Sequence, residues 1–132
     1  MTHYLCDTNI ISELSRRRPN EGVVEWAMGV KEIALSVITV EEIHYGLAWR
    51  PNARVAAWID RFIHEYADVL DVTRAVARRA GTMRGQFRAR GAPRTQADLL
   101  IAATAAEHGL TVVSRNARDF DGCGIAVLDP FT

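Results

Sequence analysis

Short apolar runs and amphipathic stretches alternate along the chain. The apolar runs predict buried strands at 3–6, 33–36, 69–72, 111–114 and 125–128. Stretches with apolar positions three and four residues apart predict helices between them, at 10–17, 21–29, 39–48, 52–66, 74–90 and 95–108. Continuous apolar strands separated by helices are typical of a parallel sheet with helices on both faces. The pattern therefore predicts an α/β fold with a central parallel sheet of four to five strands flanked by helices.

The size and composition of the chain fit one globular domain. It has 132 residues, of which 48% are hydrophobic and 24% are charged, and it contains no repeat, low-complexity tract or Gly/Ser linker. The first residues lack the basic end and apolar run of a signal peptide, and no apolar run reaches the ~20 residues of a membrane span. We therefore expect one domain over 1–132, in a cytoplasmic protein without a membrane partner.

The cysteines and histidines do not indicate a metal or redox site. Cys6 and Cys123 are too few and too far apart for a disulfide scaffold or a zinc knuckle. The four histidines are scattered along the chain, whereas zinc ligands recur at short spacings. We expect both cysteines to be buried thiols, and Cys6 to belong to the core.

Carboxylates recur where the predicted strands end and the next helices begin. Asp7 ends the first strand, and three later segments bring a further acid to the same edge of the sheet: Glu42, Asp98 and Asp119. In an α/β fold, ligands bind beyond the carboxyl ends of the strands. These four acids are therefore the candidates for a functional site.

Each acid also has a structural interpretation. Asp7 suits an N-cap and Asp119 a turn, while Glu42 and Asp98 each stand three residues after a threonine, as in a capping box. Their convergence argues for more. Three carboxylates about 5 Å apart repel by about 3 kcal/mol per pair at an effective dielectric constant of about 20, and three pairs cost about as much as a whole domain's stability. Such a cluster must be protonated, spread apart or occupied by a cation, and a divalent ion is the simplest answer.

The type of ligand selects the ion. Carboxylate sites without Cys or His favour Mg²⁺ or Mn²⁺ over Zn²⁺, and magnesium held by a few carboxylates is typical of sites that handle phosphates. The chain has no glycine-rich phosphate loop, which argues against a nucleoside triphosphate as the ligand.

Basic residues gather in one part of a chain whose formal net charge is zero. Seven arginines and no acid lie between Asp71 and Asp98. A solvated helix face is one interpretation of this stretch. Contact with a phosphate backbone is the other, because arginine forms paired hydrogen bonds with phosphate oxygens.

Four short segments occur in an order that connects the acids. They are Asp7–Asn9 after an apolar strand, 36–43 followed by Gly46, 96–105, and 113–116 leading to Asp119 and Phe120. In this order and spacing they resemble the PIN-domain family, and specifically the VapC-type toxins of bacterial toxin–antitoxin pairs. The resemblance runs nearly end to end, and residues 128–131 also resemble the C-terminal part of the family.

The resemblance implies an endoribonuclease that depends on Mg²⁺ or Mn²⁺ and hydrolyses RNA phosphodiester bonds. It implies that Asp7, Glu42 and Asp98 bind the metal and act in catalysis. Glu41 is rejected, because in the family the acid stands four residues before the glycine. Either Asp119 or Asn116 completes the set, and we take Asp119 as the fourth catalytic and metal-binding acid.

Further residues are expected to assist these acids and to bind RNA. Thr8, Asn9, Ser114 and Asn116 would hydrogen-bond the carboxylates or the attacking water. The arginines expected to contact RNA phosphates are Arg84, Arg88, Arg90 and Arg115.

The resemblance also implies protein partners, namely a cognate antitoxin and a homodimer or a higher toxin–antitoxin assembly. The chain has more bulky apolar residues than its core requires: Trp26, Trp49, Trp58, Ile59 and Phe62. Most of this surface is expected to be buried, and the remainder would form a groove for an antitoxin helix or a homodimer face.

Two other functions remain open at this point. The chain could be a PIN-like scaffold that acts with its antitoxin as a DNA-bound repressor. It could also be a phosphatase of the haloacid-dehalogenase type, in which a second Asp stands two residues after the first. This chain has Asn9 at that position, which counts against the phosphatase.

Overall fold

The computed structural model describes residues 2–132. The strands of this part are β1 (Tyr4–Cys6), β2 (Ile33–Ser36), β3 (Ala67–Leu70), β4 (Thr111–Val113) and β5 (Val127–Leu128). The α-helices are α1 (Thr8–Leu14), α2 (Glu21–Met28), α3 (Val37–Trp49), α4 (Ala53–Tyr66), α5 (Arg74–Ala89) and α6 (Gln96–His108), and a short 3₁₀ helix, η1 (Ala117–Phe120), follows β4.

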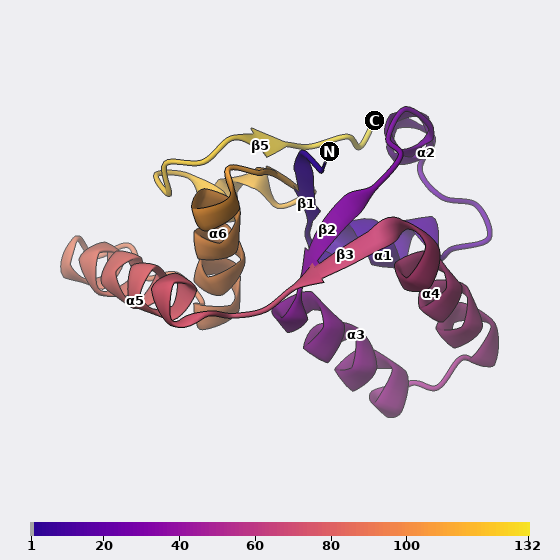
Figure 1. Ribbon diagram of the computed structural model, residues 1–132, viewed down its shortest axis with the longest axis horizontal. Helices are drawn as coiled ribbons and strands as arrows, with labels where there is room; N and C mark the ends of the chain where they lie inside the picture. The colour runs from indigo at the N-terminus through magenta and orange to yellow at the C-terminus, as the bar shows by residue number, and fades with distance from the viewer. Residues whose placement is uncertain (1) are drawn as a thin grey trace.

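The strands form one parallel sheet in the order β3-β2-β1-β4-β5. In Figure 1, α5 and α6 lie on one side of the sheet and α1 to α4 on the other. The predicted α/β fold, with a parallel sheet flanked by helices, is confirmed. Within residues 2–132, no helix is long and apolar enough to cross a membrane.

Alternating side chains of the strands supply two separate cores. Leu5, Ala34 and Val112 pack with α5 and α6. Their neighbours Cys6, Leu35 and Val113 pack with α1 to α4. Because successive side chains of a strand point to opposite faces, both faces of the sheet are buried, and this is why the strands read as continuous apolar runs.

Two helices begin earlier than the sequence pattern predicts, because polar residues at the strand ends cap them. Asp7 caps α1 by accepting a hydrogen bond from the Thr8 N–H, and the helix ends at Leu14 rather than at 17. Ser36 caps α3, since its Oγ accepts from the Ile38 N–H at 3.0 Å. The interpretation of Thr39 and Glu42 as a capping box is therefore wrong. The corresponding N-cap at Thr95 is confirmed, with the Asp98 N–H 3.2 Å from its hydroxyl.

The two edge strands differ from their predicted bounds. β3 begins directly after α4, because Ala67 pairs with Ile33 and Leu70 with Ser36, so the strand lies two residues before the predicted one. β5 retains only Val127 and Leu128, which pair with Val112 and Val113 of β4.

The strand order places an opening between β1 and β4. From β1 the chain proceeds to β2 and β3 on one side, and then returns to β4 and β5 on the other side of β1. Ligands of open α/β sheets bind at such a reversal of strand order, beyond the carboxyl ends of the strands. Here these ends carry Asp7 and Ser114.

Candidate metal-binding active site

Asp7 lies at the centre of a network of hydrogen bonds that joins β1 to β4. Its Oδ2 accepts from the Ser114 hydroxyl at 2.8 Å and from the Asn9 amide at 3.1 Å, and its Oδ1 accepts from the Thr8 N–H at 2.8 Å. The side chain is buried, with 6% of the residue exposed. Three donors on a buried carboxylate hold it in one orientation. As supporting residues, Thr8, Asn9 and Ser114 therefore lie where the sequence analysis expects them.

Glu42 reaches the same region from α3. Its Oε1 accepts a hydrogen bond from the Thr8 hydroxyl at 2.7 Å, and that hydroxyl lies 3.3 Å from the buried hydroxyl of Thr39. Thr39 thus faces the site, although it does not cap the helix. Glu41, one residue earlier, is exposed and does not line the site.

Asp98 completes a set of three carboxylates at the first turn of α6. Burial raises the pKa of the Asp98 carboxyl above its ordinary value, and the negative charges of Asp7, Asp119 and Glu42 raise it further, against a hydrogen bond from Thr95 that lowers it. The charges of the other three candidate acids are therefore close enough to act on Asp98.

A cavity of about 470 Å³ lies over these acids. Asp7, Glu42 and Asp98 line it together with Thr8, Asn9 and Asn116. Within residues 2–132, however, no three His, Cys, Asp or Glu side chains gather closely enough to hold a metal ion as they stand. The acids share one cavity but converge less tightly than the sequence analysis expects.

The chemistry of the cavity fits a hard divalent cation. Its titratable lining consists of carboxylates and arginines, and its other polar groups are hydroxyls and amides. Mg²⁺ and Mn²⁺ prefer such oxygen ligands. Burial is the main cause of the raised pKa of Asp98, and the neighbouring carboxylates add a repulsion that a bound cation would relieve.

Because the pKa of Asp98 is raised in the folded protein, the stability of the protein should depend on pH. The folded protein binds a proton at Asp98 more tightly than the unfolded chain does. At a pH above the folded pKa, the ionised carboxylate therefore lowers the free energy of unfolding. At a pH below the unfolded pKa, Asp98 is protonated in both states and this destabilisation vanishes. Without divalent cations, Asp98→Asn is therefore expected to raise Tm at neutral pH, by about 3 °C, and to leave it unchanged in acid. Thermal unfolding across this pH range measures the difference.

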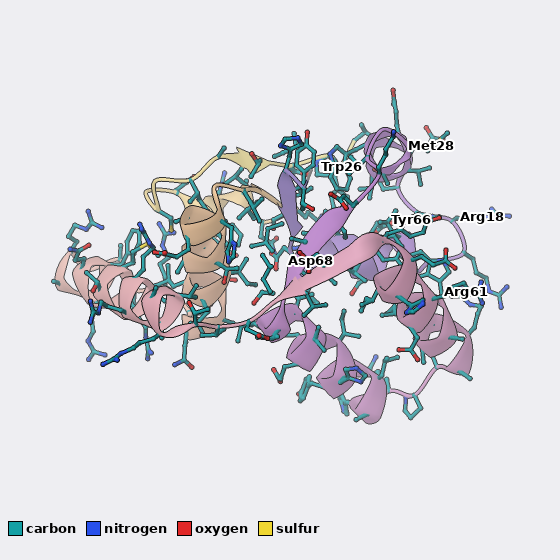
Figure 2. All side chains as sticks on the ribbon, in the orientation of Figure 1. Arg18, Trp26, Met28, Arg61, Tyr66 and Asp68 are labelled. Carbon is teal, nitrogen blue, oxygen red and sulfur yellow. The ribbon has the colours of Figure 1, made fainter. Side chains whose placement is uncertain are left out.

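The matched control is Asp68→Asn, on the exposed edge strand β3 and outside the cavity (Figure 2). It should leave Tm unchanged at every pH. A Tm of Asp98→Asn at or below that of the wild type at neutral pH would show that neither burial nor the neighbouring charges destabilise the ionised Asp98.

The two candidates for the fourth position lie side by side in the chain segment after β4. Asn116 lines the cavity, and its N–H donates to the Ser114 hydroxyl at 3.0 Å. Asp119 is exposed in η1 and borders a neighbouring hollow instead. It acts on Asp98 through its charge, so its role as a ligand stays a prediction.

The predicted RNA-binding arginines separate into two groups. Arg115 lines the cavity. Arg84 and Arg88 in the C-terminal half of α5, and Arg90 directly after it, are exposed and do not line the cavity. The Arg90 guanidinium carbon lies 4.8 Å from the centre of the Phe87 ring. Contact between these three arginines and RNA stays a prediction.

The sequence analysis missed four residues that line the cavity: Ser12, Glu13, Arg16 and Phe131. Ser12 had a readable signal. It stands four residues after Thr8, which places both on one face of a helix that begins at Thr8. The predicted helix started two residues too late for this face to be noticed. No pattern in the sequence singles out Phe131.

The bulky apolar residues have divided roles. Ile59 is buried, and the Trp58 ring stacks on Phe62 with 4.9 Å between the ring centres. Trp26 and Phe62 line an apolar hollow of about 290 Å³ between α2 and α4, beside Met28 and Tyr66 (Figure 2). Trp49 is 67% exposed on α3. Whether an antitoxin or a second copy covers these faces stays a prediction.

Both cysteines are buried thiols, as expected. Burial raises the pKa of the Cys6 thiol well above its ordinary value, and the adjacent Asp7 raises it further. A thiol that stays protonated is a poor nucleophile, so the reaction at this site does not use Cys6.

Comparison with known proteins shows which family the chain resembles over nearly its whole length. A family model for the PIN domain matches residues 4–123. Toxin FitB from Neisseria gonorrhoeae is 33% identical over 96% of this chain and 97% of its own length, and the VapC ribonuclease Y4jK from Sinorhizobium fredii is 32% identical over 95% of each. In a DNA-bound VapBC complex from Salmonella typhimurium, one chain is similar with a TM-score of 0.82 and 29% identity, covering 98% of both chains.

Proposed function

The chain belongs to the PIN-domain family, and from that premise we propose that it is a ribonuclease toxin that cuts RNA with the help of Mg²⁺ or Mn²⁺ and is neutralised by a cognate antitoxin. The observation that carries the proposal is the shared cavity. Asp7, Glu42 and Asp98 come from β1, α3 and α6, far apart in the sequence, and all three line it. Relatives that match nearly the whole chain are named as a toxin and as a ribonuclease.

The proposed reaction is hydrolysis of a phosphodiester bond. Water adds across the bond between phosphorus and the 3′ oxygen, so that the hydroxyl goes to phosphorus and the proton to the leaving oxygen. The products are a 5′-phosphate and a 3′-hydroxyl. A bound divalent ion lowers the pKa of a water ligand and neutralises charge on the phosphoryl group, and Asp7, Glu42 and Asp98 would hold it, with Asp119 or Asn116 as the fourth group.

The chain's own residues prepare this site in three ways. Ser114 and Asn9 fix Oδ2 of Asp7, which leaves the orientation of that carboxylate independent of the substrate. Thr8 holds Oε1 of Glu42 at 2.7 Å, so that the two acids remain at a set separation. Asn9 also links the two sides of the site, since its Oδ1 accepts from the Arg115 N–H at 3.0 Å.

Partners and location follow from the same premise. The VapBC complex from Salmonella typhimurium supports an antitoxin as the partner of this chain. Hydrolysis of cellular RNA fits the expected cytoplasmic location. The match to the PIN domain leaves the phosphatase alternative without support.

A second role has one specific observation in its favour. The Salmonella typhimurium VapBC complex is bound to DNA, which supports repression of transcription by the toxin together with its antitoxin. The intact acids Asp7, Glu42 and Asp98 argue that catalysis persists beside this role.

Glu42→Gln and Glu41→Gln form a matched pair that tests the proposed function. Both remove one negative charge from the first half of α3, but only Glu42 faces the cavity. We expect Glu42→Gln to lower the rate of RNA cleavage about 100-fold, since loss of one ligand removes several kcal/mol of charge stabilisation, and Glu41→Gln to cleave like the wild type. The measurement is cleavage of total cellular RNA by the purified proteins with Mg²⁺ or Mn²⁺. Equal rates for the two variants would contradict the assignment of Glu42.

A further inference from the structure

We infer that Arg16 and Arg115 bind two phosphates of the RNA strand and hold it across the acidic cavity. The inference rests on the proposed function and names how the substrate is bound. Both arginines line the cavity, and they come from different segments of the chain, Arg16 from the loop after α1 and Arg115 from the loop after β4.

The negative charge of the cavity lining means that an RNA strand needs cationic side chains to bind there. Four carboxylates line the cavity, including Glu13, against the two guanidinium groups. This surplus of two negative charges matches the charge of one divalent cation. A strand with a negative charge at every nucleotide needs cationic groups beside that ion, and arginine binds a phosphate through two parallel hydrogen bonds.

The guanidinium of Arg16 contacts the Glu13 carboxylate on one side and is exposed to solvent on the other. Its Nη1 lies 3.2 and 3.4 Å from the two carboxylate oxygens of Glu13. The Glu13 side chain is 8% exposed, whereas that of Arg16 is 66% exposed. Within residues 2–132 the guanidinium hydrogen-bonds through Nη1 alone, so its remaining N–H groups are available to a ligand.

Arg115 is positioned by a backbone hydrogen bond to Asn9 and by contact of its guanidinium with the Phe131 ring. Its N–H donates to Asn9, and its guanidinium carbon lies 4.8 Å from the centre of the Phe131 ring. A cation over an aromatic face is attracted by it without using its N–H donors. Phe131 therefore orients the guanidinium and leaves its hydrogen bonds for the substrate.

Asn20 connects the residues that position the two arginines. Its N–H donates to Glu13 Oε2 at 2.8 Å, which holds the partner of Arg16. Its side chain binds Thr132, next to Phe131, with Oδ1 accepting from the Thr132 N–H at 3.1 Å and Nδ2 donating to the main-chain oxygen at 3.0 Å. The two arginines are thus positioned by one connected structure.

Gly22 makes this connection possible. Its N–H donates to Asn20 Oδ1 at 3.0 Å and to the Thr132 hydroxyl at 3.3 Å. A Cβ at this position would collide with the Pro130 carbonyl oxygen and the Thr132 methyl group. The close approach of residues 130–132 to the start of α2 is therefore a specific feature, and it brings Phe131 to the cavity.

The test is the salt dependence of RNA binding by Arg16→Gln and Arg115→Gln. Glutamine removes the positive charge at both positions, and at position 16 it keeps a donor for Glu13. With a fluorescein-labelled single-stranded RNA of mixed sequence in EDTA, each variant should bind about tenfold more weakly at low salt. A plot of log K against log salt should be shallower by about 0.7 for each variant, because each phosphate contact on a single strand contributes about that slope. Fluorescence anisotropy measures both quantities.

Two further variants keep the result specific. Arg16→Lys retains the charge, so it should keep the wild-type slope, which a merely structural role would not predict. Arg18→Gln is the matched control, since Arg18 lies two residues further along the same loop, extends away from the molecule in Figure 2 and does not line the cavity. Its slope and affinity should equal those of the wild type.

The inference is overturned if the wild type does not bind the RNA, or if Arg16→Gln and Arg115→Gln have the same slope as Arg18→Gln. Cleavage of total RNA by the wild type with Mn²⁺ is measured in parallel. Cleavage with unchanged slopes would reject the two arginines and leave the proposed function intact. Reduced slopes without cleavage would support the arginines and reject the proposed function.

Discussion

Asp7→Asn is expected to abolish toxicity in growing cells and to lower kcat/KM for RNA cleavage about 10³-fold. Asparagine has the shape of aspartate, and its Oδ1 can still accept the hydrogen bond from the Thr8 N–H. It lacks the negative charge at the centre of the site. A bound divalent ion supplies several kcal/mol of transition-state stabilisation, and about 4 kcal/mol corresponds to a factor of about 10³ in rate.

Expression of both forms in cells, followed by mapping of new RNA ends, measures this effect. The wild type should arrest growth and create new 5′-phosphate ends, and Asp7→Asn should do neither at an equal protein level. Asp68→Asn serves as the control, because it removes a carboxylate outside the cavity. Equal toxicity of Asp7→Asn and the wild type would contradict the assignment of Asp7.

Removal of divalent cations is the second change with a large expected effect. Dialysis against EDTA should reduce RNA cleavage by about 10³-fold or more, and addition of Mg²⁺ or Mn²⁺ should restore it. The physical reason is the lining of the cavity, where Asp7, Glu42 and Asp98 provide negative charge but no nucleophile. Cleavage measured before dialysis, after it, and after addition of each ion tests the expectation. Full activity in EDTA would show that the acids work without a metal.

The period of apolar residues was sufficient to predict the fold. Leu5 and Cys6 belong to opposite cores, and a strand buried on both faces has no polar alternation, so its apolar run and its helical neighbours together indicated a parallel sheet. The first and last residues of the helices depended on local capping hydrogen bonds, which the spacing of apolar residues does not indicate. Ser36, for example, caps α3, which therefore begins at Val37, two residues before its predicted start.

The candidate site was predictable where a residue's position depends on the end of a strand. Asp7 follows β1, so its place at the sheet edge followed from the topology. Glu42 reaches the same cavity from α3, which follows β2 directly, whereas Asp98 reaches it from the first turn of α6, the helix before β4. How tightly the acids converge was not predictable, because the hydroxyl of Thr8 and the donors around Asp7 set the distances.

The basic residues were the least predictable part. Arg88 belongs to a conspicuous arginine-rich stretch but lies on α5, which packs against α6 and lines no part of the acidic cavity. Arg16 and Arg115 do line it. Their place depends on the loop after α1 and on the approach of Phe131, and neither is encoded as a periodic pattern.

The central claim is that these carboxylates together bind a divalent cation, and calorimetric titration of the metal-free protein with Mn²⁺ tests it most directly. The wild type is expected to take up Mn²⁺, and Asp98→Asn to bind it about 100-fold more weakly, because one of three charged ligands is lost. No uptake by the wild type, or equal affinity of the two proteins, would contradict the account.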